Sequence, residues 1–401
     1  MDNTPIVLAY SGGLDTSFCI PWIKENYSKD VITLTVDTGG LSEEKKRKIK
    51  KRAIYLGAKE HYLIDSKDEY FEKIIKYLIA GNIKKGQLYP LCVGAERGLQ
   101  AEKLASFMLE KNLQTVAHGC TAAGNDQIRF DVALKTINPK IKIIAPVRDN
   151  NWLREEQIDF LKKRKLYLDE SETSYSINHG LWGVTIGGIE TLDSCETIPE
   201  DAWPLSKSAF SSPRKPSQHK LTFDQGIPKK INGKSYNPVQ LIEKLEKIAC
   251  EYAIGRGIHL GDTILGTKGR VAFEAPAAII LIEAHRELEK LVLSSHQIKA
   301  KEILSSIYGD LIHEGKQLDL VCEDIKTFFS SSQRRVTGEV SFSLKPGNLF
   351  ISGVKSKHSL LSASSGKYGE KIGDWSAEDA RGFSNILSIS GSLQSIASGD
   401  Y

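Results

Sequence analysis

The stretch VLAYSGGLDTS, residues 7–17, decides the fold of the first part of the chain. It opens as an apolar run typical of a buried strand and ends in two glycines, an acid and hydroxyl residues. When a buried strand stops at paired glycines and a helix follows, the free N–H groups at the helix N-terminus can bind phosphate. The alternative is a tight strand-to-helix turn without a ligand, in which Gly, Ser and Asp are also common. Because the whole string follows a strand, we favour the phosphate pocket.

The residues of this loop suit such a pocket in different ways. Gly12 and Gly13 let the backbone turn sharply and approach an anion. Asp15 has two possible roles, since it can cap the helix or hold a Mg²⁺ ion that bridges phosphates. Hydroxyl donors come from Ser11, Thr16 and Ser17. The spacing matches neither Gly-x-Gly-x-x-Gly nor Gly-x-x-x-x-Gly-Lys-Ser/Thr, which argues against the nicotinamide and kinase types of phosphate loop.

Short apolar runs and longer helical patterns alternate from residue 5 to about residue 150. The runs that predict strands are IVLAY (6–10), VITLTV (31–36), EHYLI (60–64), TVAHG (115–119) and KIIAPV (142–147). Helices are predicted at 43–56 and 67–80, where Gly57 and Gly81 are placed to end them. This alternation predicts an α/β fold, in which a parallel sheet with helices on both faces binds its ligand at the carboxyl ends of the strands.

The pattern changes after about residue 165. Strands and turns are predicted at 180–192 and 221–234, with an exposed connection at 211–220. Helices are predicted to start at Asn237 and Pro276.

The end of the chain predicts a hairpin at 338–354 and a short, isolated helix at 376–389. That helix either packs on a neighbouring subunit or folds back on its own domain. We therefore expect a parallel-sheet nucleotide-binding domain at 1–168, an α+β domain at 169–365 and a C-terminal helical tail at 366–401.

Composition limits the classes of partner. The chain has 54 basic and 50 acidic residues, and its net charge of +4 is too small to demand nucleic acid or membrane. The six cysteines form no Cys-x-x-Cys pair, and no charged and apolar leader precedes the first strand. We expect a cytoplasmic protein that acts on small molecules.

Four strings carry a resemblance to a known family. AYSGGLDTS (9–17) resembles the PP-loop of enzymes that cleave ATP to AMP and pyrophosphate. AHGCTAAGNDQIRF (117–130), YSINHGLWG (175–183) and RRVTGEVSFSLKPGN (334–348) resemble argininosuccinate synthase in the same order. With weaker similarity between them, the resemblance covers nearly the whole chain.

The resemblance implies the ligation of citrulline to aspartate. The ureido oxygen attacks the α-phosphorus of ATP, pyrophosphate leaves, and the aspartate amine displaces AMP. ATP is then a substrate that requires Mg²⁺, and family members are typically homotetramers. Positioning and charge neutralisation around the phosphates are the physical requirements of this reaction.

The resemblance also assigns residues. Asp15 and Asp126 take catalytic roles, with Asp15 as the Mg²⁺ ligand. The ATP-binding set is Ala9, Tyr10, Ser11, Gly12, Gly13, Leu14, Asp15, Thr16, Ser17, Val36 and Gly119. The aspartate-binding set is Thr121, Asn125 and Asp126, and the citrulline-binding set is Tyr89, Asn125, Arg129, Ser176 and Thr185.

The segment around Asn125 is also informative by itself. Asn125 or Asp126 can start a helix with a core stripe of Phe130, Ala133, Leu134 and Ile137. Asn125 and Arg129, four residues apart, share one side of it. Without the resemblance, a capped helix with a solvated Arg129 is the simpler interpretation. We expect His118 to pack at a strand end rather than act as a base.

The chain departs from the family at several positions. Family members usually have Lys at the position of Ala123, Thr-Ser at Val93 and Gly94, and Glu and Tyr at Gly261 and Phe273. A cation near the phosphates and polar groups at the amino-acid end of citrulline are therefore missing.

Two interpretations of these departures remain. Asp262 or Glu274 could replace the lost groups, and the acceptor is then ordinary citrulline. Alternatively, the acceptor is an Nα-acylated citrulline, acetylated or succinylated, for which the two glycines make room. Separately, Pro21 falls inside the first predicted helix, where it removes a hydrogen bond and should kink the chain at a cost of about 3 kcal/mol.

Two rival functions share the loop. A tRNA-modifying thiolase would use a cysteine pair such as Cys120 and Cys195, although the balanced charge argues against a nucleic-acid partner. A nucleotide-binding regulator without chemistry is the other rival.

Overall fold

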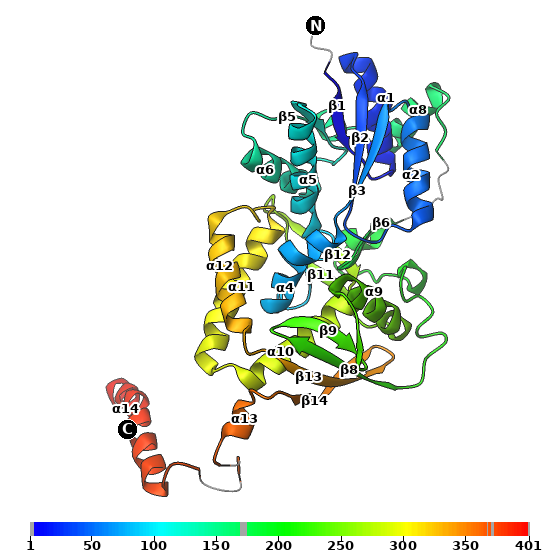
Figure 1. Cartoon of the computed structure of the whole chain (residues 1–401). Coiled ribbons are helices and arrows are strands. Elements are labelled where there is room, and N and C mark those ends of the chain that lie inside the picture. The colour runs from blue at the N-terminus through cyan, green and yellow to red at the C-terminus, as the bar shows by residue number, and fades with distance from the viewer. Residues whose placement is uncertain (1–3, 169–174, 367, 370–372, 400–401) are drawn as a thin grey trace.

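The computed structural model describes residues 4–168, 175–366, 368–369 and 373–399. Two packed bodies and a separate C-terminal helix make up the molecule (Figure 1). The predicted boundary at 168/169 falls beside residues outside the described set, so the division into three domains stays a prediction.

The first body contains the predicted parallel sheet, in the order β3-β2-β1-β4-β5. The strands are β1 (Ile6–Ala9), β2 (Val31–Asp37), β3 (Glu60–Asp65), β4 (Thr115–Ala117) and β5 (Lys142–Ile144). Because β1 lies in the centre, between β2 and β4, the loop that follows it opens at the middle of the carboxyl edge. The prediction of a strand up to residue 147 is wrong, since Pro146 begins the helix α7 (Pro146–Asp149).

Alternating side chains of β1 separate the two faces of this sheet. Ile6 and Leu8 pack in one cluster with helices α1 (Leu14–Tyr27), α2 (Glu43–Tyr55) and α8 (Arg154–Lys163). Val7 packs in the opposite cluster with α5 (Glu96–Glu110) and α6 (Asn125–Ile137). The helices thus cover both faces, as predicted. Pro21 is buried inside α1, which continues through it to Tyr27.

The helix predicted at 67–80 does not cover the sheet. It forms as α3 (Lys67–Tyr70), the π-helical turn Phe71–Ile75 and α4 (Lys76–Ala80). Its apolar side chains belong to the core of the second body, and Figure 1 shows α4 there. Its strongly apolar face therefore serves packing between the bodies rather than the sheet.

The second body contains two antiparallel sheets. One has the order β10-β9-β8-β13-β14 and the other β11-β12-β7-β6. Their strands are β6 (Ser176–Gly180), β7 (Gly183–Gly187), β8 (Ser217–Asp224), β9 (Ile227–Ile231), β10 (Lys234–Ser235), β11 (Arg256–Asp262), β12 (Lys268–Glu274), β13 (Gly338–Lys345) and β14 (Asn348–Lys355). The predicted hairpin is β13–β14, which turns at 345–348.

Helices fill the rest of the second body. They are α9 (Pro238–Ala249), α10 (Pro276–Val292), α11 (Ser295–His313) and α12 (Leu320–Gln333), with short 3₁₀ turns at Ile189–Leu192, Glu200–Ala202 and Cys250–Tyr252. Asn237 caps α9 by accepting from Gln240 N–H at 2.8 Å, as predicted. Sequence reasoning did not predict α11 or α12. Among the described residues, no helix is long and apolar enough to cross a membrane.

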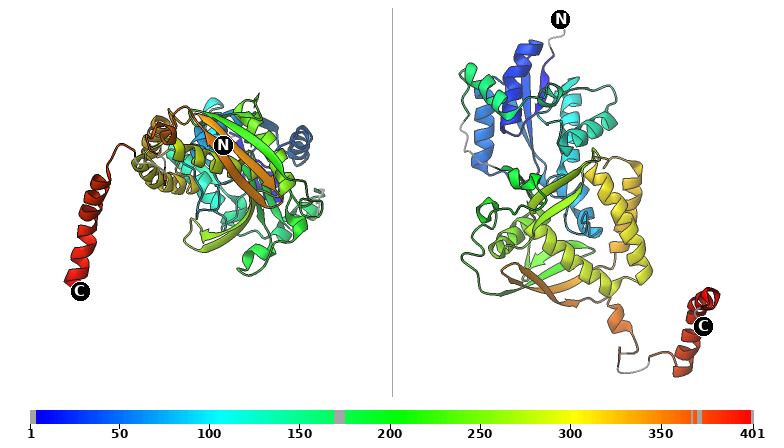
Figure 2. Two further views of the ribbon diagram at one scale, coloured as in Figure 1. Left: turned by 90° about the horizontal axis from the view of Figure 1, so that it is seen from below. Right: turned by 180° about the vertical axis from the view of Figure 1, so that it is seen from behind.

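The chain ends in α13 (Leu360–Ala363) and α14 (Ala377–Ser398). The latter is longer than predicted and contains no buried residue. Figure 2 shows α14 apart from both bodies in two directions of view. The fold-back alternative for this helix is therefore wrong.

Candidate active site

The loop between β1 and α1 requires glycine at its turn. Gly12 has a φ of 79°, in the left-handed region. A Cβ atom there would also lie 2.9 Å from Ile49 of α2. Gly13 is the N-cap of α1, and its N–H donates to Ser11 Oγ at 3.3 Å. The next amides of α1 have no partner within the helix, so they can bind an anion.

Asp15 lies in the first turn of α1 rather than at its cap. The helix starts after Gly13 without a side-chain cap, so the capping alternative for Asp15 is wrong. Burial raises the pKa of Asp15, although Gln157 and Arg154 act to lower it. A half-buried carboxylate of this kind is stabilised by a cation brought close to it.

The three hydroxyl residues of the loop differ in orientation. Ser11 and Thr16 lie 3.1 Å apart, oxygen to oxygen, and both line the central cavity. Ser17 is fully buried, and its hydroxyl lies 3.2 Å from the Tyr10 hydroxyl instead. The Ser17 side chain therefore does not reach the space in which a nucleotide would lie.

Gly119 brings a second backbone segment against the loop. It follows β4, and a Cβ atom on it would lie 2.9 Å from Thr16 N. Any side chain at this position would crowd the N-terminus of α1. A glycine here keeps that N-terminus open.

One cavity of about 1060 Å³ joins the two bodies. Every residue named above for ATP, aspartate or citrulline lines it except Ser17. It also contains the departures Val93, Gly94, Ala123 and Gly261, whereas Phe273 is buried behind it. The structure thus brings the predicted site residues, which are spread between positions 9 and 185 of the sequence, to a single cavity.

Cations that sequence reasoning missed line the cavity beside the loop. Lys45, Lys48 and Arg52 come from one side of α2, and Arg154 comes from the start of α8. Arg52 Nη1 donates to Gly12 O at 2.7 Å. The basic run at residues 45–52 was the available signal. These side chains supply positive charge to the same cavity, to which Ala123 supplies none.

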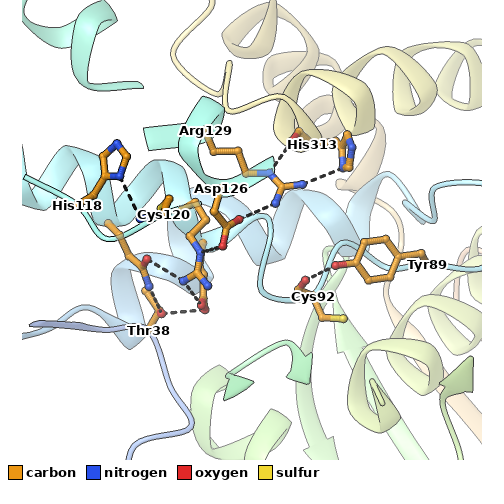
Figure 3. Close-up of polar contacts among 11 residues, drawn as sticks. Thr38, Tyr89, Cys92, His118, Cys120, Asp126, Arg129 and His313 are labelled. Carbon is orange, nitrogen blue, oxygen red and sulfur yellow. Dashed lines mark hydrogen bonds and ion pairs between the residues drawn. The ribbon is translucent and has the colours of Figure 1, made fainter. Parts of the chain in front are cut away.

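Asp126 is held between two guanidinium groups (Figure 3). Its Oδ2 accepts from Arg97 Nε at 2.9 Å, and its Oδ1 accepts from Arg129 Nη1 at 2.8 Å. Burial opposes ionisation, but the two arginines outweigh it and lower the pKa of Asp126 to about 2. Asp126 is therefore a carboxylate at any physiological pH.

Arg129 connects α6 to the second body. It is 6 % exposed, so the interpretation as a solvated side chain is wrong. Its Nε donates to His313 O at 2.7 Å, and Nη2 lies 3.1 Å from His313 Nδ1. Burial and the Arg129 charge lower the pKa of His313 to about 3, which keeps His313 neutral.

Asn125 makes another contact between the bodies. It starts α6, as predicted, and its Oδ1 accepts from Ile264 N–H at 2.9 Å. Ile264 lies in the turn between β11 and β12. The predicted stripe of α6 is correct, because Phe130, Ala133 and Leu134 are buried.

Tyr89 lies at the far end of the cavity. Its hydroxyl donates to Cys92 O. Its ring stacks on His259 at 5.6 Å and packs against Phe273 at 5.2 Å between centroids. Burial raises the pKa of the Tyr89 hydroxyl well above its usual value. Ser176 on β6 and Thr185 on β7 lie on the neighbouring sheet.

Gly94 and Gly261, two of the positions at which the chain departs from the resembled family, do not leave an empty space. A Cβ atom at Gly94 would lie 3.1 Å from the Arg129 guanidinium. A Cβ atom at Gly261 would lie 2.6 Å from His259 Nε2. The space expected for an acyl group is therefore partly filled by Arg129 and by His259, and sequence reasoning did not place His259 here.

The two acids considered as replacements differ in availability. Glu274 is buried, and its carboxylate accepts from Leu205 N–H and Ser206 Oγ–H away from the cavity. Asp262 lines the cavity and forms a 2.5 Å ion pair with Lys268. Of these two acids, only Asp262 can replace the missing polar group at the amino-acid end of citrulline without breaking a buried contact.

His118 has contacts at both ring nitrogens. Nε2 lies 3.0 Å from Asp131 Oδ1, and Nδ1 accepts from Cys120 N–H at 3.3 Å. This arrangement suits the expected packing role at the end of β4. The thiol pair of the rival thiolase is not assembled, because Cys120 lines the cavity while Cys195 is exposed outside it.

Two family models match the sequence of this chain. Residues 5–167 match the family model described as the arginosuccinate synthase N-terminal HUP domain. Residues 175–394 match the arginosuccinate synthase C-terminal domain.

Curated relatives match over nearly the whole length. An argininosuccinate synthase of Dictyoglomus thermophilum is 38% identical over 402 residues, covering 100% of both chains. The enzyme of Sulfurisphaera tokodaii is 37% identical over 96% of this chain and 97% of its own. That of Methanocaldococcus jannaschii is 37% identical over 91% and 92%. With the phosphate loop, the shared cavity and both domain matches, the chain belongs to the argininosuccinate synthase family.

Proposed function

We propose that this protein is an AMP-forming carbon–nitrogen ligase that condenses citrulline with aspartate to argininosuccinate, a step of arginine biosynthesis. The observation that carries the proposal is the single cavity with an anion-binding helix N-terminus at one end and the Asp126–Arg129 pair at the other. This cavity can hold a nucleotide and two amino acids in contact, as the two-step reaction requires. Family membership does not favour an acylated acceptor, a tRNA thiolase or a regulator.

ATP binds at the loop in this proposal. Backbone amides after Gly13 contact the phosphates, and Ala9, Val36 and Gly119 border the nucleotide, with the other loop residues named above. Asp15 would hold Mg²⁺ together with the phosphates, since this ion is commonly bound by one carboxylate, substrate oxygens and water. The bound ion would neutralise charge on the leaving pyrophosphate.

The amino acids bind beyond the α-phosphate. Thr121, Asn125 and Asp126 serve aspartate, whose amino group is a suitable partner for the carboxylate of Asp126. Arg129 serves citrulline together with Asn125, Tyr89, Ser176 and Thr185. Pairing of Arg129 with His313 O limits the orientations of its guanidinium.

Pyrophosphate release by the purified full chain tests the proposal. With ATP, Mg²⁺, aspartate and citrulline, we expect equal amounts of pyrophosphate, AMP and argininosuccinate. Omission of aspartate should prevent argininosuccinate formation. Absence of pyrophosphate release with all substrates present, or release without argininosuccinate, would overturn the proposal.

The assembly we propose is a cytoplasmic homotetramer that uses α14 as a contact between subunits. This helix exposes a row of large apolar side chains: Phe383, Ile386, Leu387, Ile389, Leu393 and Ile396. Light scattering should give four times the chain mass, and Leu393→Asp should lower it. The matched control is Ser392→Asp, next to it on the same helix. A monomeric wild type would contradict this assembly.

A further inference from the structure

Glu96 is a buried carboxyl group in the cavity wall to which the reaction scheme gives no role. It begins α5 and is 3 % exposed. Its Oε2 accepts from the Thr38 hydroxyl at 2.8 Å, and its Oε1 accepts from Arg97 Nη1 at 3.1 Å. Both oxygens of this carboxyl therefore have fixed partners.

The position of Glu96 is further restricted by the second body. A Cβ atom on Gly180 would lie 2.3 Å from Glu96 Oε2, so the carboxyl packs directly against this backbone. Nearby, Leu181 N–H donates to Thr38 O at 3.1 Å. Glu96 thus lies where the end of β2, α5 and the end of β6 meet.

A continuous row of charged side chains runs from Glu96 to the substrate residues. Glu96 contacts Arg97, and Arg97 contacts Asp126. Asp126 in turn contacts Arg129 (Figure 3). Gln100 Oε1 also accepts from Arg97 Nη1, at 2.9 Å. The direction in which Arg97 Nε points is therefore set by Glu96 and Gln100 at one end of the guanidinium and Asp126 at the other.

We propose that ionised Glu96 is a positioning residue of the aspartate site, which orients Arg97 toward Asp126 and cancels one of the two guanidinium charges around it. With Glu96 ionised, the row of four side chains has no net charge. With Glu96 neutral, the row carries +1. A positive row disfavours the amino group of aspartate, the only cation that this substrate could place against Asp126.

Other groups around Glu96 are compatible with a single titration there. Burial raises the pKa of Glu96 to about 7, although Arg97 and Thr38 act to lower it. Burial raises the pKa of Tyr70 and of Cys92, so both are neutral. Asp126 remains ionised, and His179 on β6 also faces Glu96 and acts to lower its pKa.

This inference rests on the proposed function, and the pH profile of aspartate binding tests it. If only the ionised form binds aspartate well, KM for aspartate at saturating ATP, Mg²⁺ and citrulline should be about tenfold higher at pH 6 than at pH 8. Glu96→Gln should fix KM at the high value and remove this dependence. We expect kcat and KM for ATP to change less than about twofold, since the phosphate end keeps its contacts.

Three variants show which group causes the pH dependence of KM for aspartate. Glu102→Gln, on the same helix α5 and ion-paired with Lys73, should behave as the wild type. If His179→Gln rather than Glu96→Gln removes the pH dependence, the proposal is overturned. A pH-independent KM in the wild type overturns it as well, even if Glu96→Gln does not fold.

Asp126→Asn distinguishes this inference from the site assignment. A strong rise in KM for aspartate in this variant, with no effect of Glu96→Gln, would refute the role of Glu96 alone. No effect of Asp126→Asn on KM for aspartate would refute the assignment of Asp126, and the inference with it.

Discussion

The two ends of the cavity are built in different ways. At the phosphate end, contiguous residues from β1 to α1 present backbone N–H groups, and Gly12 and Gly119 keep them accessible. At the amino-acid end, charged side chains from α5 and α6 hold one another in place, and Arg129 of α6 donates to the His313 carbonyl of α11. Backbone geometry therefore defines the first end, and tertiary contacts define the second.

This difference has consequences for tolerance to change. Backbone donors stay in place when single side chains are replaced, provided that glycines remain at the turn. A buried charge at the other end loses its compensation when one partner is removed. Substitutions at the two ends should accordingly separate effects on turnover from effects on stability.

Asp15→Asn should produce the largest effect, because Asp15 is the one loop side chain expected to organise Mg²⁺. We expect kcat to fall at least about 100-fold, the size seen when a group that stabilises developing charge is lost. The urea midpoint should stay the same or rise, since a half-buried carboxyl whose pKa is raised by burial is replaced by a neutral group. Asp30→Asn, in the turn after α1, is the control and should leave kcat unchanged. Equal losses of stability and activity in Asp15→Asn would refute the functional role.

The same comparison explains what the sequence could predict. The phosphate loop and the parallel sheet with helices on both faces depend on local pattern, so they could be predicted from residues 5–150, whereas the strand order was not predicted. Asp126 and Arg129 could be assigned roles through the family resemblance, because the helix start at Asn125 by itself indicates only a capped helix. Arg97 could not, because its role depends on the packing of α5 against α6.

Long-range contacts account for the other omissions. His313 lies 184 residues from Arg129 along the chain, and nothing in its local sequence indicates that contact. The helix at 67–80 was predicted, but its local sequence does not show that its apolar face packs in the core of the second body. The space around Gly261 was misjudged because His259 from the same strand occupies it.

Arg129→Gln should give the next effect, now on stability as well as binding. Loss of this buried arginine removes one of the two cations beside Asp126, whose side chain is 34 % exposed, so we expect a cost of about 2 kcal/mol, less than for a fully buried pair. KM for citrulline should also rise. Arg148→Gln is the control, since the Arg148 side chain is 21 % exposed against 8 % for Arg129, and it should cost at most about 1 kcal/mol. If urea unfolding gave the same loss of stability for both variants, the amino-acid end of the cavity would not depend on contacts between its charged side chains.

His313, at the amino-acid end of the cavity, should have a smaller effect on stability, and this effect should depend on pH. Its folded pKa of about 3 lies below its usual value, so the unfolded chain takes up a proton in acid that the folded chain does not. Stability is therefore lost as pH falls below about 6.5, by about 2 kcal/mol at pH 5. His313→Asn should reduce the loss measured by urea unfolding between pH 7.5 and 5. His296→Asn, exposed on the same helix α11, should not. Identical losses in the two variants would show that His313 stays unprotonated in both states or protonated in both.

Replacement of the α2 cations should give the smallest effect. Lys45 and Lys48 are exposed at the cavity edge, and Lys48 pairs with Glu44 at 2.7 Å, so solvent screens both. We expect Lys45→Ala with Lys48→Ala to raise KM for ATP by a factor of about 2 to 5, equivalent to at most about 1 kcal/mol. The increase should shrink at 0.5 M salt. Lys50→Ala with Lys51→Ala, on the same helix but outside the cavity lining, is the charge-matched control. A large, salt-independent loss in the first pair would mean that side chains, and not backbone amides, provide most of the binding at the phosphate end.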